Sequence, residues 1–311
     1  MNDLGLSILL PAYNNVCLPL VEILASQCRD LAGRMPSDCA FDYEIIVADD
    51  GSTDAAVIEQ NKKIGDIGRC RYIIRGYNSG RSQIRNFLAR EASFPWLLFI
   101  DSDMMVEKSD FVASYLDAVK DGGASARVVV NGGVTISSSA PCDDHNLRYI
   151  YELDALPRHT AEKRREREFA DFHTANFLVG RDLMLSHPFD ERFHHYGYED
   201  VLFGKALKAD GTGIRHIDNP VSFIDFESNE HFVEKTEEGL RTLAEFSDDL
   251  QGYSAVLSMA DRLRKIGIAP IARCFFSMIR KPIRRNLTGS KPCLTLFRIY
   301  KLGYLLTLKN K

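Results

Sequence analysis

The chain has 311 residues, of which 45% are hydrophobic, and it carries a net charge of -4. It is long enough to bury the core of one large domain or roughly two ordinary ones. Its seven cysteines are scattered, without a close pair at metal-ligand or redox spacing, which favours a reduced compartment. No signal peptide is predicted, because the N-terminus lacks a basic segment, and no run reaches the roughly 18 to 20 apolar residues of a membrane-spanning helix.

Short apolar runs alternate with amphipathic stretches along the first 133 residues. Each run is bounded by turn or polar residues, as expected of a buried strand. The predicted strands are 6–11, 43–48, 71–75, 96–100 and 126–133, and the predicted helices are 16–33, 53–64, 80–92 and 109–120. Such alternation predicts an α/β fold with a mostly parallel sheet that helices cover on both faces.

Polar clusters follow three of these strands. The first strand ends in "PAYNN", the second in "DDGSTD" (49–54) and the fourth in "DSD" (101–103). Because ligands bind beyond the carboxyl ends of parallel strands, we expect all three clusters to line one edge of the sheet as a site. "DDGSTD" alone is also typical of a turn that caps a helix.

Asp101 and Asp103 are two carboxylates separated by one residue at the end of a buried strand. Their hard oxygen atoms favour Mg²⁺ or Mn²⁺ over zinc, and such ions complete their coordination with substrate phosphates. The other interpretation of paired acids at a strand end is helix capping. The first interpretation predicts a metal that holds a diphosphate.

Five segments together resemble glycosyltransferase family 2. Four are "SILLPAYNN", "EIIVADDGSTD", "NSGRSQIRNFLAREA" (78–92) and "WLLFIDSDM". The fifth, "FDERFHHYGYEDVLFGKALKADG" (189–211), is similar to the acceptor-side motif of this family and of galactosyltransferase-type relatives, in which Gly-x-Glu-Asp begins a helix. The resemblance implies a GT-A fold, a nucleotide-sugar donor, a divalent metal and inversion at the anomeric carbon.

The resemblance also implies roles for the donor-side residues. Pro11 and Tyr13 would flank the nucleobase, and Asp50 would bind its edge. Asp103 would bind the metal directly with Asp101 near the ribose, while the nucleotide and its phosphates would contact Asn78 and Arg85. These roles suit an aromatic ring that stacks on a base and an arginine that spreads diphosphate charge. The alternatives are a core tyrosine at position 13 and a helix-surface arginine at position 85.

On the acceptor side the resemblance points to Asp200 as the general base that removes the acceptor hydroxyl proton. Glu199 would bind an acceptor hydroxyl or orient the loop. The alternative is an acidic pair that the helix macrodipole favours. His231 lies where some relatives place a third metal ligand, although a histidine at a helix start is as often a cap, and His173 borders the cleft without an assigned role.

The chain is predicted to divide at residue 261. Residues 1–261 form the catalytic domain, with 26 basic and 43 acidic residues, whereas 262–311 form a tail with 13 basic residues and no acid. The tail mixes bulky apolar with basic residues, as expected of amphipathic helices on an anionic membrane surface. The alternative is a small helical subdomain packed on the body. No nucleic-acid motif is recognisable.

These observations predict a single-sugar glycosyltransferase of envelope polysaccharide synthesis, peripheral on the inner, cytoplasmic face of the cytoplasmic membrane. We expect a UDP-sugar donor and a glycan or lipid-linked acceptor. The segment 134–172 is interpreted either as the variable lid over the acceptor or as a surface helix. The alternative functions are a catalytically silent sugar-nucleotide or glycan-binding scaffold and a sugar nucleotidyltransferase, whose Gly-rich loop after the first strand is replaced here by "PAYNNVCLP".

Overall fold

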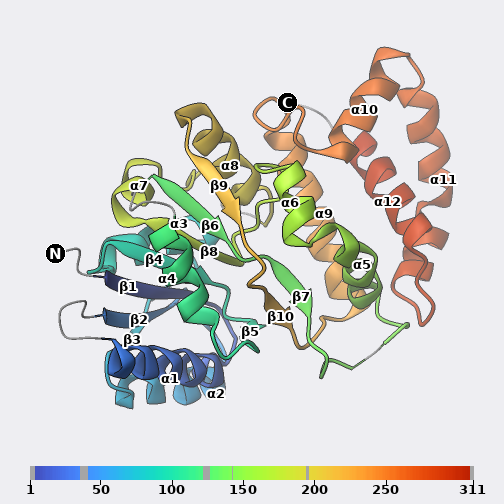
Figure 1. Ribbon diagram of the computed structural model, residues 1–311. Coiled ribbons are helices and arrows are strands. Elements are labelled where there is room, and N and C mark those ends of the chain that lie inside the picture. The colour runs from blue at the N-terminus through green and yellow to red at the C-terminus, as the bar shows by residue number, and fades with distance from the viewer. Residues whose placement is uncertain (1–3, 36–40, 122–126, 142, 194–195, 309–311) are drawn as a thin grey trace.

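The computed structural model describes residues 4–35, 41–121, 127–141, 143–193 and 196–308. A sheet with flanking helices holds the N-terminal half, and helices of the C-terminal part lie beside it (Figure 1). The strands are β1 (Leu4–Ala12), β2 (Phe41–Asp49), β3 (Cys70–Ile74), β4 (Trp96–Ile100), β5 (Met104–Met105), β6 (Val128–Asn131), β7 (Val134–Ile136), β8 (Asn176–Gly180), β9 (Gly213–His216) and β10 (Val221–Phe223). The helices are α1 (Leu18–Arg34), α2 (Ala55–Lys62), α3 (Arg81–Glu91), α4 (Phe111–Asp121), α5 (Leu147–Ala155), α6 (Ala161–Glu166), α7 (Arg181–Ser186), α8 (Glu199–Asp210), α9 (Asn229–Glu245), α10 (Ala255–Lys265), α11 (Ala269–Leu287) and α12 (Leu294–Thr307).

The main sheet has the strand order β3-β2-β1-β4-β8-β6-β9. Strands β3, β2, β1 and β4 are mutually parallel, β8 is antiparallel to both of its neighbours, and β9 is parallel to β6. The five predicted strands and the α/β fold class are confirmed. The antiparallel β8 was not predicted, because "NFLVG" is too short to stand out from its surroundings.

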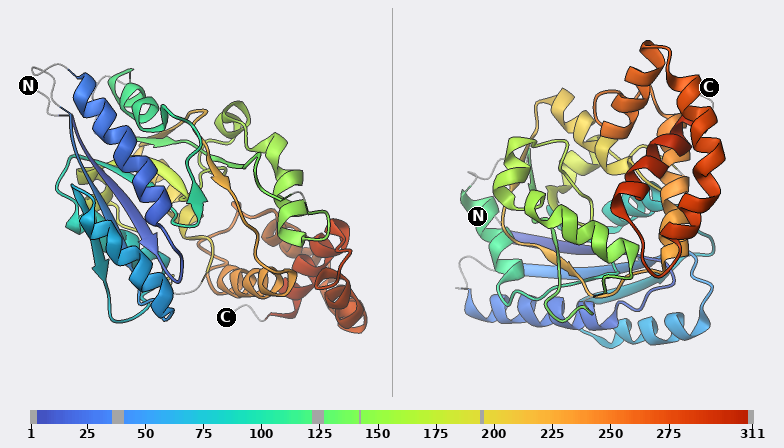
Figure 2. Two further views of the ribbon diagram at one scale, coloured as in Figure 1. Left: turned by 90° about the horizontal axis from the view of Figure 1, so that it is seen from below. Right: turned by 90° about the vertical axis from the view of Figure 1, so that its right-hand side faces the viewer.

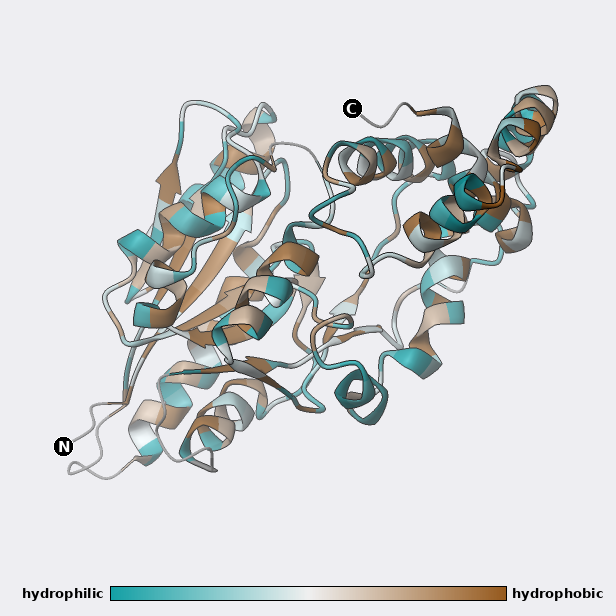
Figure 3. Ribbon diagram, turned by 90° about the horizontal axis from the view of Figure 1, so that it is seen from above, coloured by the Kyte–Doolittle hydropathy of each residue, from teal (hydrophilic) through white to brown (hydrophobic). Residues whose placement is uncertain are grey.

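Both faces of this sheet are buried, as the apolar runs predicted. On β1, Leu6, Ile8 and Leu10 pack on one face with α1 and α4, whereas Leu9 packs on the other with α3 and α8. This alternation follows from the two-residue period of a strand. In Figure 3 the strands are mostly coloured hydrophobic, between helices with hydrophilic outer turns. Burial of both faces leaves the strand ends as the natural place for polar side chains.

The C-terminal helices share a third hydrophobic core with α9 and the start of α5. From the tail this core includes Phe276, Leu287, Phe297 and Tyr300. Helices α11 and α12 approach closely at Gly303, where an added Cβ would lie 2.1 Å from the ring of Phe276. These helices lie at the opposite end of the molecule from β3 and α2 (Figure 2, left).

The boundary expected at residue 261 falls inside α10, which runs from Ala255 to Lys265. The helices beyond it are packed against α9, as expected if the tail is a small helical subdomain on the body. A cut at residue 261 would remove half of a shared apolar core. None of the helices described here is long and apolar enough to cross a membrane.

Candidate functional site

A cavity of about 650 Å³ opens at the carboxyl ends of β1, β2 and β4, where the three polar clusters were expected to meet. Its walls include six of the residues predicted to bind donor, namely Pro11, Tyr13, Asp50, Asn78, Arg85 and Asp101. We call it the donor-side cavity. The parallel register of β1 with β2 and with β4 brings these strand ends together.

Asp50 organises one wall of the donor-side cavity. Its carboxylate accepts hydrogen bonds from the backbone N–H of Ser79 at 3.0 Å and of Gly80 at 2.9 Å, and it pairs with Arg75 at 3.0 Å. Gly51 beside it has a φ of 80°, and a Cβ there would lie 2.5 Å from the Tyr77 carbonyl carbon. Only glycine suits such a turn, so the loop that follows β2 is locked against residues 77–80.

The side chains of Tyr13 and Asn78 are both exposed at this cavity. Tyr13 keeps 48% of its surface accessible, which excludes the core-tyrosine interpretation. Its ring is therefore free to stack on a planar ligand. The residue that follows Tyr13 is fixed, because the Oδ1 of Asn14 accepts hydrogen bonds from the backbone of Thr53 and Asp54.

Arg85 is buried, with only 1% of its side chain accessible, and is therefore neither a surface arginine nor open to solvent. Its guanidinium contacts Asp101 at 2.6 Å and Glu199 at 3.6 Å. The pairs with these two carboxylates engage its two terminal nitrogens, while its Nε has no hydrogen-bond partner. Arg81, one turn earlier on α3, lines the cavity with 41% of its side chain accessible and was missed in the sequence.

Asp103 has no ion pair within the described part of the chain, whereas Asp101 is held by Arg85. Desolvation of the Asp103 carboxylate, and then the charge of Asp101, raise the pKa of Asp103 above its usual range. A carboxylate with an uncompensated charge and hard oxygen atoms fits a divalent cation whose other ligands are phosphates and water.

His231 does not converge on Asp103. Its Nε2 lies 3.2 Å from a carboxylate oxygen of Glu227, one turn away, and the ring is largely exposed at the rim of the donor-side cavity. Among the residues that the structure places, no group of three or more His, Cys, Asp or Glu side chains forms a metal cage. Asp101 and Asp103 are the two carboxylates that line both cavities at the end of β4.

A second cavity, of about 400 Å³, adjoins the first, and we call it the acceptor-side cavity. The two share Arg81, Asp101, Asp103, Tyr196 and Lys235 as walls. Helices α5, α8, α9 and α12 contribute further walls, together with strand and loop residues such as Val134, His173 and Phe223. The segment 134–172 thus contributes a wall through α5, in agreement with the lid interpretation, and α12 brings residues of the C-terminal tail to the site.

Asp200 lines the acceptor-side cavity and lies in the first turn of α8. The turn before it is strained, since Gly197 and the non-glycine Tyr198 have φ values of 100° and 70°. The Nδ1 of His173 lies 3.7 Å from Oδ2 of Asp200. Burial alone would lower the pKa of His173, but its close approach to Asp200 and the charge of that carboxylate raise it overall.

Glu199 occupies a different environment from its neighbour Asp200. It is 5% exposed and lies between Arg85 at 3.6 Å and Arg81 at 3.8 Å. Burial raises the pKa of Glu199 and the charge of Asp200 adds to the rise, although both arginines oppose it. The pair thus divides into a buried acid that joins helices α3 and α8 and a cavity-facing acid beside a histidine.

The sequence model described as glycosyl transferase family 2 matches residues 7–184. The chain belongs to glycosyltransferase family 2. Chondroitin synthase from Pasteurella multocida is 24% identical to this family member over 256 residues, which make up 71% of this chain and 25% of that protein. Validoxylamine A glucosyltransferase from Streptomyces hygroscopicus subsp. jinggangensis is 28% identical over 230 residues, 66% of this chain and 52% of that protein.

The chain therefore spans between a quarter and about half of the length of these curated relatives. Among solved structures, S. aureus TarS 1-349 in complex with UDP-GlcNAc has a TM-score of 0.50 and 17% sequence identity. That similarity covers 98% of this chain and 90% of the other, and it shows the shared fold. The family membership and the GT-A-like fold expected from the sequence are confirmed.

We expect Arg85→Met to destabilise the protein by about 3 to 5 kcal/mol, because the substitution leaves the carboxylates of Asp101 and Glu199 without their shared buried cation. Urea unfolding followed by circular dichroism measures the change. Arg90→Met, on an exposed position of the same helix, is the matched control and should change stability by no more than about 0.5 kcal/mol. Equal stability of the two variants would contradict the structural role of Arg85.

Proposed function

We propose that this family 2 protein is an inverting, metal-dependent glycosyltransferase that moves a sugar from a UDP-sugar to a hydroxyl of a glycan or lipid-linked acceptor. The observation that carries the proposal is the shared wall between two cavities, with unpaired Asp103 at the wall and Asp200 in the second cavity. That wall is where an anomeric carbon would lie, between a departing diphosphate and an attacking hydroxyl.

The donor would occupy the donor-side cavity. Tyr13 stacks on the base beside Pro11, and Asn78 contacts the nucleoside from the facing loop. Asp50 reaches the base edge if one of its hydrogen bonds to the loop exchanges for a base N–H. TarS, which shares the fold, was solved in complex with UDP-GlcNAc, and this supports a UDP-sugar as donor here.

The leaving group requires positive charge. Asp103, with Asp101 beside it, is suited to hold Mg²⁺ or Mn²⁺, and such an ion supplies charge that stabilises the departing diphosphate. Arg81 lies at the first position of α3, where the helix N-terminus also favours an anion. We therefore assign to Arg81 the phosphate contact that the sequence had assigned to Arg85, whose charge is already balanced.

We assign the role of general base to Asp200. An inverting displacement needs one carboxylate that accepts the acceptor proton while the new bond forms, without a covalent enzyme intermediate. The Oδ1 of Asp200 accepts a hydrogen bond from the Val201 backbone N–H at 2.7 Å, and its Oδ2 lies 3.7 Å from His173, which orients the carboxylate at the wall of the acceptor-side cavity. Glu199 keeps α8 in register with α3 through the two arginines.

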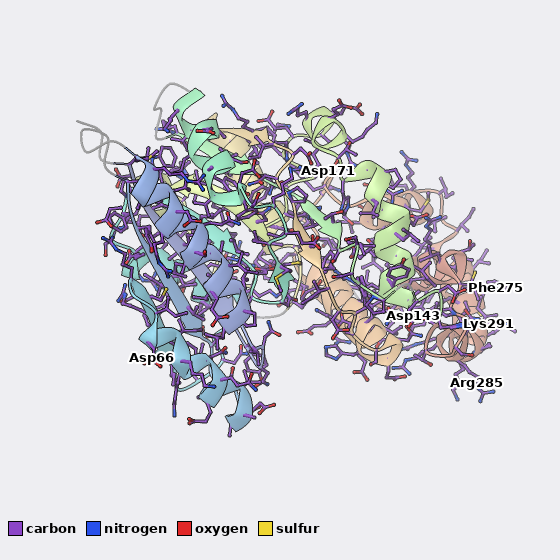
Figure 4. The ribbon with its side chains drawn as sticks, turned by 60° about the horizontal axis from the view of Figure 1, so that its bottom comes forward. Asp66, Asp143, Asp171, Phe275, Arg285 and Lys291 are labelled. Atoms are coloured by element: carbon purple, nitrogen blue, oxygen red, sulfur yellow. The ribbon has the colours of Figure 1, made fainter. Side chains whose placement is uncertain are left out.

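The protein would work at an anionic membrane surface, on the cytoplasmic side of the cytoplasmic membrane. Support comes from α11, where Ile271, Phe275 and Met278 form an exposed stripe at helical spacing. Arg273 and Lys281 are also exposed on this helix. Each basic residue near such a surface contributes about 1 kcal/mol. Figure 4 shows Phe275 and Arg285 at the outer edge of the C-terminal helices, far from Asp66.

We expect Asp103→Ala to abolish the increase in UDP affinity that Mn²⁺ produces, because the metal and diphosphate charges lose their protein ligand. Isothermal titration with UDP, with and without Mn²⁺, measures it. Asp110→Ala, at an exposed acid seven residues later that lines neither cavity, is the control and should behave as the natural protein. Undiminished Mn²⁺-dependent affinity in Asp103→Ala would refute the metal assignment.

Asp200→Asn should keep UDP affinity but lower the rate of sugar transfer by roughly 10² to 10⁴-fold, the usual contribution of a positioned general base. Asp182→Asn is the matched control, since Asp182 also lies in the first turn of a helix but on exposed α7. Turnover is followed by release of UDP in single-turnover mixtures. If both variants transfer sugar at the normal rate, Asp200 only supports its helix and the base lies elsewhere.

For the membrane, the double variant Phe275→Ser and Met278→Ser should lose co-sedimentation with vesicles that contain anionic phospholipid, while its UDP affinity stays normal. The reason is that the stripe supplies the apolar contact that anchors the basic helix. Leu185→Ser, at an exposed apolar residue of α7, serves as the control. Vesicle binding that survives the double substitution, or that is absent in the natural protein at low salt, would rule out this surface.

A further inference from the structure

The charged side chains that line the acceptor-side cavity are almost all paired. The pairs join Arg148 to Glu152 at 2.8 Å, Lys235 to Glu227 at 3.3 Å, His173 to Asp200 at 3.7 Å, Arg81 to Glu199 at 3.8 Å and Arg85 to Asp101 at 2.6 Å. His159 carries no charge at neutral pH, since burial lowers its pKa to about 4. Apart from Arg81, which also lines the donor-side cavity and is assigned there to the phosphates, two charged side chains of this cavity have no ion-pair partner among the described residues.

The first position is Asp103, at the wall shared with the donor-side cavity. The second is Lys301 on α12, for which the described residues offer no carboxylate partner. Its ammonium lies 5.0 Å from the ring centroid of Tyr151 and 4.8 Å from that of Phe297. Arg298, one turn earlier, is already paired with Asp154 at 2.8 Å.

We propose that Lys301 binds an anionic group of the acceptor, a carboxylate or a phosphate, in the acceptor-side cavity. This inference rests on the proposed glycosyltransferase function and names the class of acceptor for that same site. The two unpaired charges then have complementary tasks. Asp103 requires a cation on the donor side, and Lys301 requires an anion on the acceptor side.

The anion belongs to the acceptor because of where Lys301 lies. It lines the acceptor-side cavity with Asp200 but is absent from the wall of the donor-side cavity, where the diphosphate would bind. The rings of Tyr151 and Phe297 contact its ammonium and hold it at the wall of this cavity. A hydroxyl of the same acceptor would then face Asp200.

Two physical observations support an anionic ligand over a neutral one. Burial, and then the charge of Arg298, lower the pKa of Lys301 to about 8, so the ammonium persists at neutral pH without compensation. A partly enclosed site also strengthens the attraction of opposite charges relative to water. An anion at Lys301 thus gains a charge-assisted hydrogen bond that an uncharged sugar lacks.

The test compares matched probes by NMR titration of the full chain. The first pair is methyl β-D-glucuronide and methyl β-D-glucoside, which differ in one carboxylate, and the second is glycerol 3-phosphate and glycerol. We expect the anionic member of one pair to bind about tenfold or more tightly than its neutral partner, the size of one charge-assisted hydrogen bond. The pair that responds identifies carboxylate or phosphate as the group.

Variants separate Lys301 from the other basic residues. Lys301→Met and Lys301→Gln should remove the preference for the anion, whereas Lys301→Arg should keep it. Lys291→Met, at an exposed position that lines neither cavity, is the matched control and should leave it unchanged. Unaltered thermal unfolding shows that each variant is folded, and agreement between Met and Gln excludes an effect of the lost stem.

Equal binding of the charged and neutral probes, or a preference that persists in both Lys301→Met and Lys301→Gln, would overturn the inference. UDP affinity with Mn²⁺ is measured on the same proteins, because it tests the donor site separately. Normal UDP binding without an anion preference refutes the role of Lys301 but not the proposed transferase function. An anion preference without UDP binding leaves the Lys301 site in place and refutes the transferase.

Discussion

The ion pairs of Arg85 are the constraint on which the rest of the site depends. A guanidinium with 1% of its side chain accessible cannot remain uncompensated, so it holds Asp101 at the end of β4 and Glu199 at the start of α8. These two elements are far apart in the chain; Asp101 lines both cavities, whereas Glu199 lines the acceptor-side cavity. Because a single buried cation joins them, the geometry of the donor side and that of the acceptor side are set together.

The directions of the strands in the sheet bring the site residues to one edge. Three parallel strands end at one edge and present the loops after β1, β2 and β4, while β8 runs the opposite way and starts there, so that its preceding segment reaches the same edge. The backbone N–H of Asp101 donates to Ala175 O at 3.0 Å, which fixes the acid-bearing loop to the segment that carries His173. An antiparallel strand inside a parallel sheet thus brings the histidine to Asp200.

The C-terminal helices contribute both to a buried core and to surfaces that face solvent or the acceptor-side cavity. On α11, Phe276 and Ile283 face the core that α9 shares, while Phe275 and Met278 face solvent. On α12, Phe297 is buried in that core and also lines the acceptor-side cavity. An amphipathic helix such as α11 suits both a packed core and a membrane surface, so the sequence alone left open whether the tail packs on the body or faces a membrane.

The order of strands and helices, the polar edge of the sheet and the family were all determined by the sequence, because short apolar runs and turn residues act locally and the five motifs keep their spacing. Which charges are balanced was decided only by the tertiary structure. Arg85 and Arg81 lie one helical turn apart and are alike in sequence, yet one is buried between carboxylates and the other lines the cavities. Likewise, nothing near Lys301 in the chain predicts a place beside Asp200, since pairing and burial depend on segments that only folding brings together.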